Sequence, residues 1–268
     1  MLKPPSKREG EVDIHPTAII SHHAKLGAGV KVGPYSIIGD KVVIGDHNII
    51  EAHVVIEAWT EIGENNHLYP FTVVGTPPQD LKFKGEKSRV IIGNNNIFRE
   101  FITVNLGTLG GGGVTSIGNN NYFMAYSHIA HDCKVGNGVI FGNAGTLAGH
   151  VEVEDYATVG AFSGVHQHCV VGKYSFIGGY SVITRDVLPY SKTVGNRAKT
   201  YGVNFIGLRR SGFSPEAIQN IKSAYKILLQ SRLNTTQALE KIEREINNSP
   251  EVSYLVDFIR RSKRGIIK

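Results

Sequence analysis

The stretch "LGAGVKVGPYSIIGDKVVIGDHNII", residues 26–50, carries an aliphatic residue at every sixth position. The same spacing extends in both directions and forms three uninterrupted series, over 14–74, 92–104 and 117–183, in which each position is aliphatic or phenylalanine. A glycine directly follows many of these positions, in a chain that contains 31 glycines. Because this repeat organises most of the sequence, it decides the fold.

A period of six excludes an α-helix, because a 3.6-residue repeat would carry these side chains around the helix axis. Short strands joined by tight turns fit the period, since every sixth side chain then points inward and glycine tolerates the left-handed backbone of a turn. This is the hexapeptide pattern of a parallel β-helix, whose stacked coils bury one continuous apolar column. A β-sandwich with coincidental spacing is the alternative. We predict an all-β parallel β-helix followed by a small α-helical C-terminal domain.

Two segments interrupt the repeat, "TPPQDLKFKGEKSR" at 76–89 and "NLGTLGGGGVTS" at 105–116. We expect both to be loops expelled from the β-helix, and insertions of this kind often carry binding residues. The glycine run at 110–113 lacks the Lys-Ser/Thr ending and the following helix of a phosphate-binding P-loop. The run therefore gives little support to nucleoside triphosphate binding.

Helix signals replace the repeat after residue 183. The segment "SPEAIQNIKSAYKILLQ" at 214–230 has Ser214 as N-cap, Pro215 in the first turn and apolar residues spaced for one helix face. "TTQALEKIEREI" and "SPEVSYLVDFIRRSK" repeat the pattern, the latter with Ser249 as N-cap. We predict two domains, a β-helix over 1–191 that includes both loops and an α-helical domain over 192–268.

Composition and charge narrow the classes of protein. The chain has 268 residues, of which 41% are hydrophobic and 19% charged, as in a globular protein. Residues 192–268 hold 15 Lys and Arg against 6 Asp and Glu, a net +9 in a chain of net +6. This basic part fits an acidic protein partner or a phosphorylated ligand, and no nucleic-acid recognition motif accompanies it. We expect a cytoplasmic protein, because the N-terminus resembles no signal peptide, no stretch is long enough for a membrane span, and cysteines are few.

Three six-residue steps make one coil, so residues 18 apart should stack at about 4.8 Å. Cys133 and Cys169 are two coils apart, roughly 9–10 Å, which is beyond disulfide reach. We expect both to be free thiols. Asp132, His150 and His168 should form a ladder on one face, with His131 over Gly149 in the next coil.

Five histidines fall within three adjacent coils: His128, His131, His150, His166 and His168. One interpretation is general-base catalysis, in which imidazole takes a proton from a hydroxyl near neutral pH, Asp132 orients His131 if the backbone turns there, and glycine backbone binds the oxyanion. No serine or cysteine nucleophile motif accompanies the cluster, which favours direct transfer. A second interpretation is a metal on the Asp132, His150 and His168 ladder, as in zinc carbonic anhydrases of this fold. A third is a solvated histidine face on a non-catalytic scaffold.

Longer motifs are more specific than the repeat. The stretches "HIAHDC", "GTLAGHVEVEDYATVGAFSGVHQHCVVG" and "GNRAKTYGVNFIGLRRSGFS", with the "PQDLKFKGE" and "GTLGGGG" loops, resemble the UDP-N-acetylglucosamine O-acyltransferase family, which begins lipid A biosynthesis. The resemblance covers essentially the whole chain. It implies a left-handed β-helix, a homotrimer with active sites in the clefts between subunits, and no cofactor or metal. The reaction it implies moves an R-3-hydroxyacyl chain from acyl carrier protein to the 3-hydroxyl of UDP-N-acetylglucosamine.

The resemblance also implies roles for individual residues. His131 matches the general base, Asp132 the residue that orients it, and Gly149 the backbone donor to the oxyanion. The substrate-binding set implied is Gln79, Asp80, Lys82, His128, His150, His166, Gln167, Gly179, Asn204 and Arg210. Of these, Gly179 matches the position that measures the acyl chain, and glycine there implies a long chain.

The chain departs from the family pattern near the nucleotide. Asn204 and Arg210 match contacts to the nucleotide and the donor region. Ile206 occupies a position where the family has an acidic residue, and Ser211 replaces the second of two arginines. These two changes concern the same contacts.

A further departure lies on the acceptor side, where Asn105 and Leu106 replace a His-Arg pair before the "GT" of the second loop. The acceptor atom therefore stays open between a 3-hydroxyl and a 3-amino group. The later N-acyltransferase of the same pathway is a rival, but it carries an additional N-terminal uridine-binding domain, whereas the repeat here begins at Ile14.

Overall fold

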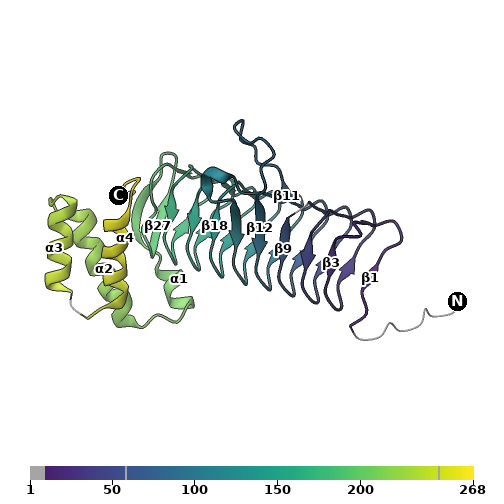
Figure 1. Ribbon diagram of the computed structural model, residues 1–268. Helices are drawn as coiled ribbons and strands as arrows, with labels where there is room; N and C mark the ends of the chain where they lie inside the picture. Colours follow the sequence, from purple (N-terminus) through teal and green to yellow (C-terminus); the bar gives the residue numbers. More distant parts are fainter. Residues whose placement is uncertain (1–9, 58, 247) are drawn as a thin grey trace.

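The computed structural model describes residues 10–57, 59–246 and 248–268 and is an elongated parallel β-helix with a cluster of helices at one end (Figure 1). Three sheets form its sides, and successive strands of the chain enter the three sheets in turn. Within the described residues the sheets hold eleven, nine and eight strands. This confirms the predicted β-helix. The expectation that the N-terminus is no signal peptide concerns mainly residues 1–9, which lie outside the described residues.

The sheets are named here after their first strands. The β1 sheet contains, in order, β1 (Asp13–Ile14), β4 (Lys31–Val32), β7 (Ile49–Ile50), β10 (His67–Leu68), β13 (Ile97–Phe98), β16 (Tyr122–Phe123), β19 (Ile140–Phe141), β22 (Thr158–Val159), β25 (Phe176–Ile177), β27 (Ser191–Val194) and β28 (Lys199–Val203). The β2 sheet contains β2 (Ile19–Ile20), β5 (Ile37–Ile38), β8 (Val55–Ile56), β11 (Val73–Thr76), β14 (Thr103–Asn105), β17 (His128–Ile129), β20 (Thr146–Leu147), β23 (Gly164–Val165) and β26 (Val182–Ile183). The β3 sheet contains β3 (Lys25–Leu26), β6 (Val43–Ile44), β9 (Thr60–Ile62), β12 (Arg89–Ile92), β15 (Val114–Ile117), β18 (Lys134–Val135), β21 (Glu152–Val153) and β24 (Val170–Val171).

Neighbouring coils stack in the register that the repeat predicts. The Cα of Thr146 pairs with that of His128 on one side and that of Gly164 on the other, 18 residues away in each direction. The repeat positions are all buried except Ile14, Ile20 and Leu26. These three belong to the first coil, where no further coil covers the end of the apolar column.

Residues with left-handed backbone angles recur at the corners between sheets. At the corner between the β1 and β2 sheets, side chains stack with ring centroids 4.9–5.2 Å apart. We call this row the aromatic corner; it consists of Tyr35, His53, Phe71, Phe101 and Tyr126. At the corner between the β2 and β3 sheets, three residues with φ of 59–62° make up what we call the histidine corner: Asp132, His150 and His168.

The two interruptions of the repeat behave differently. The first projects from the β-helix between β11 and β12 (Figure 1). The second folds back onto the β-helix, forms the short 3-10 helix η1 (Leu109–Gly111) and buries Leu106 in the core. The residues at both ends of each interruption belong to strands, so the loops themselves span only 77–88 and 106–113. The expectation that both loops are expelled is therefore wrong for the second, because a buried carboxylate holds it.

Beyond the β-helix, the antiparallel hairpin of β27 and β28 leads into α1 (Phe205–Arg210), α2 (Pro215–Gln230), α3 (Thr235–Glu245) and α4 (Pro250–Arg261). Ser214 caps α2 as predicted, accepting the N–H of Ala217. Ser249 precedes α4 but bonds Glu251 instead of a backbone N–H, so the capping bond predicted there is wrong. A second apolar core, separate from that of the β-helix, holds the helices together. No described helix is both long and apolar enough to cross a membrane.

Candidate active site

His131 and Asp132 form a hydrogen-bonded pair although they are adjacent in sequence. On a flat strand their side chains would point to opposite faces, but β17 ends before them and the chain turns at Asp132, where φ is 59°. Nδ1 of His131 lies 2.8 Å from Oδ2 of Asp132. A carboxylate accepts hydrogen bonds and donates none, so Nδ1 carries the hydrogen and Nε2 is the basic nitrogen.

The second loop fixes the Asp132 carboxylate, whose side chain is 0% exposed. Thr108 donates its backbone N–H to Oδ1 and its hydroxyl to Oδ2, each at 2.7 Å. The N–H of Asp132 donates to the hydroxyl oxygen of Thr115 at 2.8 Å. Hydrogen bonds to a charged acceptor are the strong ones, so this set holds the carboxylate in one orientation. Sequence reasoning missed Thr108 and Thr115, because their partner lies in the next coil.

Two glycines make room for the pair. A Cβ on Gly111 would overlap the carboxylate carbon of Asp132, so the loop approaches this closely only because the residue is glycine. A Cβ on Gly149 would lie 2.6 Å from Nε2 of His131. The stacking of His131 over Gly149, which the coil length predicts, is thus observed as direct contact between the ring and the backbone.

An open pocket of about 520 Å³ lies on the outer side of the β2 sheet, in front of His131. Its lining includes six residues of the implied set: Gln79, His128, His131, Gly149, His166 and Gln167. The buried N–H of Gly149 donates to no acceptor among the described residues, while its carbonyl accepts the N–H of His168 at 3.2 Å. A free backbone donor beside a basic nitrogen is the arrangement that can stabilise an oxyanion.

Two further histidines adjoin the pair. Nδ1 of His128 lies 2.7 Å from the hydroxyl of Thr103, and burial, followed by the charge of His131, lowers the pKa of His128. The ring of His150 meets that of His131 edge-on, with centroids 5.0 Å apart. Burial also lowers the pKa of His150, against the raising effect of Asp132. Both rings are therefore favoured in the neutral form, in which one ring nitrogen can accept a hydrogen bond.

The predicted metal ladder does not converge on one point. The rings of His150 and His168 are stacked, with centroids 4.4 Å apart and planes 12° from parallel, so their ring nitrogens do not point toward a common centre. Ligand atoms of His131, Asp132 and His150 do lie within 4.8 Å of one another. Yet Nδ1 of His131 and both Asp132 oxygens are already hydrogen-bonded. These atoms are therefore committed to a hydrogen-bonded His–Asp pair, which fits the cluster better than a metal site does.

The projecting loop brings further residues of the implied set toward the histidine corner. Asp80 is half-buried, accepts the N–H of Lys82 at 2.9 Å, and its charge raises the pKa of His150 against the dominant effect of burial. Lys82 is exposed. Gly179 lies outside the pocket lining, in the turn before β26, whose Val182 does line the pocket.

The predicted nucleotide contacts lie on a different side of the molecule. Asn204 and Arg210 line a pocket of about 850 Å³ on the outer side of the β1 sheet, and it shares no lining residue with the pocket of His131. The Asn204 side chain caps α1, accepting the N–H of Gly207 and donating to the carbonyl of Tyr174. One chain therefore does not bring these residues to its own His131.

Of the four residues that depart from the family pattern, two lie in the core and two at the surface. Asn105 is buried and ties the two loops together by donating to Thr76, and Leu106 packs in the core. Neither residue lines the pocket of His131. Ile206 and Ser211 do line the pocket that contains Arg210.

The two cysteines are free and buried, as expected. Burial raises the pKa of Cys133 to about 12 and that of Cys169 to about 11. Since the thiolate is the nucleophilic form, neither group is prepared for attack at neutral pH.

A hexapeptide β-helix whose open pocket holds a hydrogen-bonded His–Asp pair beside a backbone N–H is the arrangement expected of a hexapeptide-repeat acyltransferase. The family model described as bacterial transferase hexapeptide matches 23–58, 41–76, 115–149 and 150–185. That of UDP-N-acetylglucosamine O-acyltransferase, domain 2, matches 186–267. The chain belongs to the acyl-[acyl-carrier-protein]–UDP-N-acetylglucosamine O-acyltransferase family.

Individual relatives establish this membership over nearly the full length. An enzyme of that name from Thermodesulfovibrio yellowstonii is 49% identical over 256 residues, which is 96% of this chain and 99% of the relative. The crystal structure of LpxA, a UDP-N-acetylglucosamine acyltransferase from Bacteroides fragilis, is 46% identical with a TM-score of 0.93 and covers 95% of this chain and 99% of its own. LpxA from Acinetobacter baumannii gives 44% identity and a TM-score of 0.93 over the same shares of the two chains.

Proposed function

We propose that this protein transfers an R-3-hydroxyacyl chain from acyl carrier protein to the 3-hydroxyl of UDP-N-acetylglucosamine, the first step of lipid A biosynthesis. The observation that carries the proposal is the chain of hydrogen bonds that joins His131, Asp132 and Thr108 and leaves Nε2 of His131 basic. This nitrogen lies at a pocket that also contains the free N–H of Gly149. Family membership supplies the substrates.

The geometry supports the following reaction. Nε2 of His131 takes the proton of the sugar 3-hydroxyl as its oxygen bonds to the thioester carbonyl carbon. The carbonyl oxygen becomes an oxyanion and accepts the N–H of Gly149. As the intermediate collapses, the carbon–sulfur bond breaks and the imidazolium returns its proton to the departing thiolate. Asp132 stabilises the imidazolium without taking its proton.

A homotrimer completes the site in this proposal. Support comes from the two separate pockets, since the nucleotide contacts Asn204 and Arg210 of one subunit would have to reach His131 of another. A second support is the aromatic corner, where Phe101 is 43% and Tyr126 61% exposed. An exposed stack of rings along the edge between the two pocket-bearing sheets is the kind of apolar surface that subunits cover.

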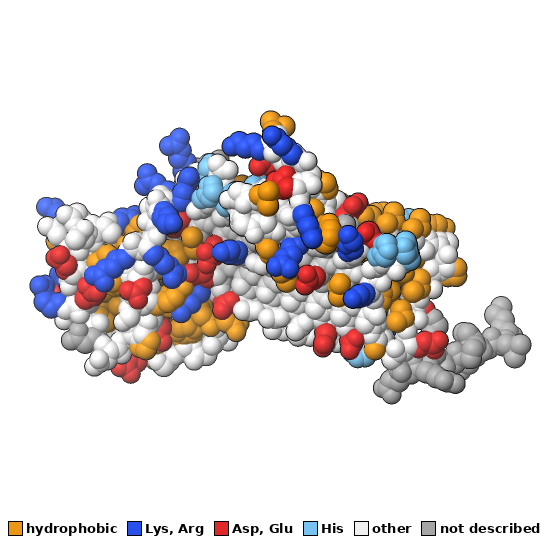
Figure 2. Space-filling view, in the orientation of Figure 1, with side chains coloured by type: hydrophobic (Ala, Val, Ile, Leu, Met, Phe, Trp, Pro, Cys, Tyr) orange, Lys and Arg blue, Asp and Glu red, His pale blue; other side chains and the backbone are white. Residues whose placement is uncertain are grey.

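Surface charge supports docking of acyl carrier protein, and the free thiols of the two cysteines support a cytoplasmic location. Lys and Arg side chains gather over the helical region and the projecting loop (Figure 2). A basic surface favours docking of an acidic carrier protein. Two buried free thiols are compatible with a reducing, cytoplasmic location.

The test is a matrix of purified enzyme with acyl carrier proteins bearing 3-hydroxyacyl chains of several lengths, each with UDP-N-acetylglucosamine or its 3-amino analogue. We expect transfer to the 3-hydroxyl, fastest with long chains because Gly179 matches the family's chain-measuring position and carries no side chain, and Gly179→Met should shift the optimum to shorter chains. Transfer to the 3-amino sugar alone would reassign the acceptor and direct attention to Asn105. No transfer to either sugar would refute the proposal.

A further inference from the structure

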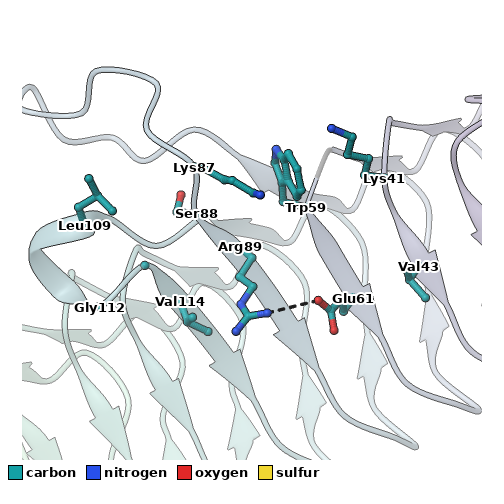
Figure 3. Close-up of a pocket in the computed structure, with 11 residues that line it drawn as sticks. Lys41, Val43, Trp59, Glu61, Lys87, Ser88, Arg89, Leu109, Gly112 and Val114 are labelled. Carbon is teal, nitrogen blue, oxygen red and sulfur yellow. Dashed lines mark ion pairs between the residues drawn. The ribbon is translucent and has the colours of Figure 1, made fainter.

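A further pocket lies on the same corner of the β-helix, on the other side of the two loops from His131. Its volume is about 500 Å³, and it opens on the outer side of the β3 sheet between β6, β9, β12 and β15 (Figure 3). The base of the projecting loop and the end of the second loop form its remaining walls. None of its lining residues belongs to the pocket of His131.

Three cations face this pocket: Lys41, Lys87 and Arg89. Nζ of Lys41 lies 4.4 Å and Nζ of Lys87 4.2 Å from the ring centroid of Trp59, and Figure 3 shows them reaching Trp59 from opposite sides in that view. Neither lysine has an ion-pair partner among the described residues. An aromatic ring can hold two ammonium groups close together, but it leaves their charge uncompensated.

Carboxylates balance part of this charge. Among the described residues Glu61 is the only carboxylate in the lining, and its Oε1 lies 3.6 Å from Nη1 of Arg89, with both side chains about half exposed. Two more carboxylates lie outside the lining: Asp40, which is hydrogen-bonded to His23 and interacts electrostatically with Lys41, and Glu86, which accepts the N–H of Lys84. The lining therefore keeps a surplus of two positive charges.

An unpaired hydroxyl lies in the same lining. The hydroxyl of Ser88 is buried and has no hydrogen-bond partner among the described residues, and the residue is 4% exposed. Most buried polar side-chain atoms are hydrogen-bonded, so this hydroxyl is free to donate to a ligand that enters the pocket. Backbone of Gly112 and Gly113 also lines the pocket, where a ligand can approach without meeting a side chain.

We propose that this pocket is an anion site for a phosphate- or pyrophosphate-bearing metabolite. Lys41 and Lys87 hold the phosphate oxygens, and Ser88 donates its free hydroxyl to them. Phosphate is the common biological anion with enough oxygens to engage two ammonium groups and a hydroxyl together. The site is distinct from the acyl-transfer centre and does not rest on the reaction proposed above.

The position of the pocket gives binding a route to the active site. Lys87 and Ser88 are the last two residues of the projecting loop, which also carries Gln79 and Asp80. Gly112 directly follows η1, which is preceded by Thr108, the residue that fixes Asp132. An anion bound here would restrain the ends of both loops.

Trp59 makes the proposal directly testable, because it is the single tryptophan of the chain and lies in the pocket. Inorganic pyrophosphate is titrated into the full-length protein at constant ionic strength while tryptophan fluorescence is followed. We expect a saturable change as the lysines turn from the ring to the anion. Lys41→Gln and Lys87→Gln should each weaken binding about tenfold, and Ser88→Ala by a few-fold.

Matched controls are Lys25→Gln and Lys134→Gln, two exposed lysines on the same sheet outside the pocket. They should bind pyrophosphate like the wild type. A wild-type protein without a saturable fluorescence change at millimolar pyrophosphate would overturn the proposal. So would equal weakening in the control variants, since that result would mean diffuse attraction by surface charge. Thermal unfolding of each variant checks that the fold is kept.

Discussion

The aromatic corner and the histidine corner have the same backbone and different chemistry. Both are rows of residues with left-handed φ, one coil apart, whose rings stack with centroids 4.4–5.2 Å apart. At the aromatic corner the stack consists of four aromatic rings and His53, and it is exposed. At the histidine corner Asp132 starts the row, is fully buried and is held by a loop from the preceding coil.

The difference indicates that the repeat places residues at the corners, whereas the loops that interrupt the repeat bring the polar partners that orient them. Stacking alone produces an exposed row of rings, as at Phe101 and Tyr126. At the histidine corner a loop folds back, buries a carboxylate and so fixes the orientation of the adjacent His131 ring. The following predictions test this comparison.

The largest effect is expected from Asp132→Asn. The amide cannot accept from both Thr108 donors and His131, so the ring loses its orientation and its tautomer. We expect kcat to fall about a thousandfold with KM for the sugar nucleotide little changed. Steady-state kinetics with one acyl carrier protein donor measure this, and Cys133→Ala, which changes the next buried residue, should stay within a few-fold of wild type.

At the aromatic corner, Phe101→Asp places a charge inside the ring stack. If subunits cover this edge, the substitution should weaken association by about 2 kcal/mol or more, as for a hot-spot residue. Sedimentation should then show smaller species, and activity should recover with protein concentration. Lys25→Asp, an exposed charge change on the β3 sheet, is the control. Unchanged sedimentation of Phe101→Asp would separate this corner from the subunit interface.

A smaller loss is expected from Thr108→Val, which removes the hydroxyl donor to Oδ2 and keeps the backbone donor to Oδ1. One hydrogen bond to a charged group is worth about 1.5–3 kcal/mol, so kcat/KM should fall roughly ten- to a hundredfold. Thr236→Val, at an exposed position of α3, should have no effect. Wild-type kinetics for Thr108→Val would show that the second loop does not orient the pair.

The smallest effect concerns pH. The folded pKa of His128 is lowered, chiefly by burial, so the unfolded chain takes up a proton at a higher pH than the folded chain does. Stability from this group is present above the unfolded pKa of about 6.5 and is lost as pH falls below it. Thermal unfolding should show that wild type loses more stability than His128→Gln between about pH 7.5 and pH 5.5. An equal loss in both proteins would exclude this contribution.

The sequence alone predicts what depends on spacing. The six-residue repeat predicts the coils, the buried column and the contact of His131 with Gly149, because all follow from a fixed register. The repeat does not predict which residues a loop that interrupts it will contact. The bond from Thr108 to Asp132 joins residues 24 apart, a separation outside the 18-residue register, and the buried Leu106 lies in a segment expected to be exposed. The unpaired lysines around Trp59 also escape the repeat, since Lys87 reaches that corner from the end of a loop.

The most direct test of the central claim is acyl transfer by His131→Ala, measured beside wild type with one 3-hydroxyacyl carrier protein and UDP-N-acetylglucosamine. The ring lines an open pocket and does not belong to the apolar core, so thermal unfolding and sedimentation should show that the fold and the oligomer are kept. We predict that kcat falls at least about a thousandfold, as expected when a general base is removed. A variant that keeps activity within tenfold of wild type would contradict the assignment of His131 as the base.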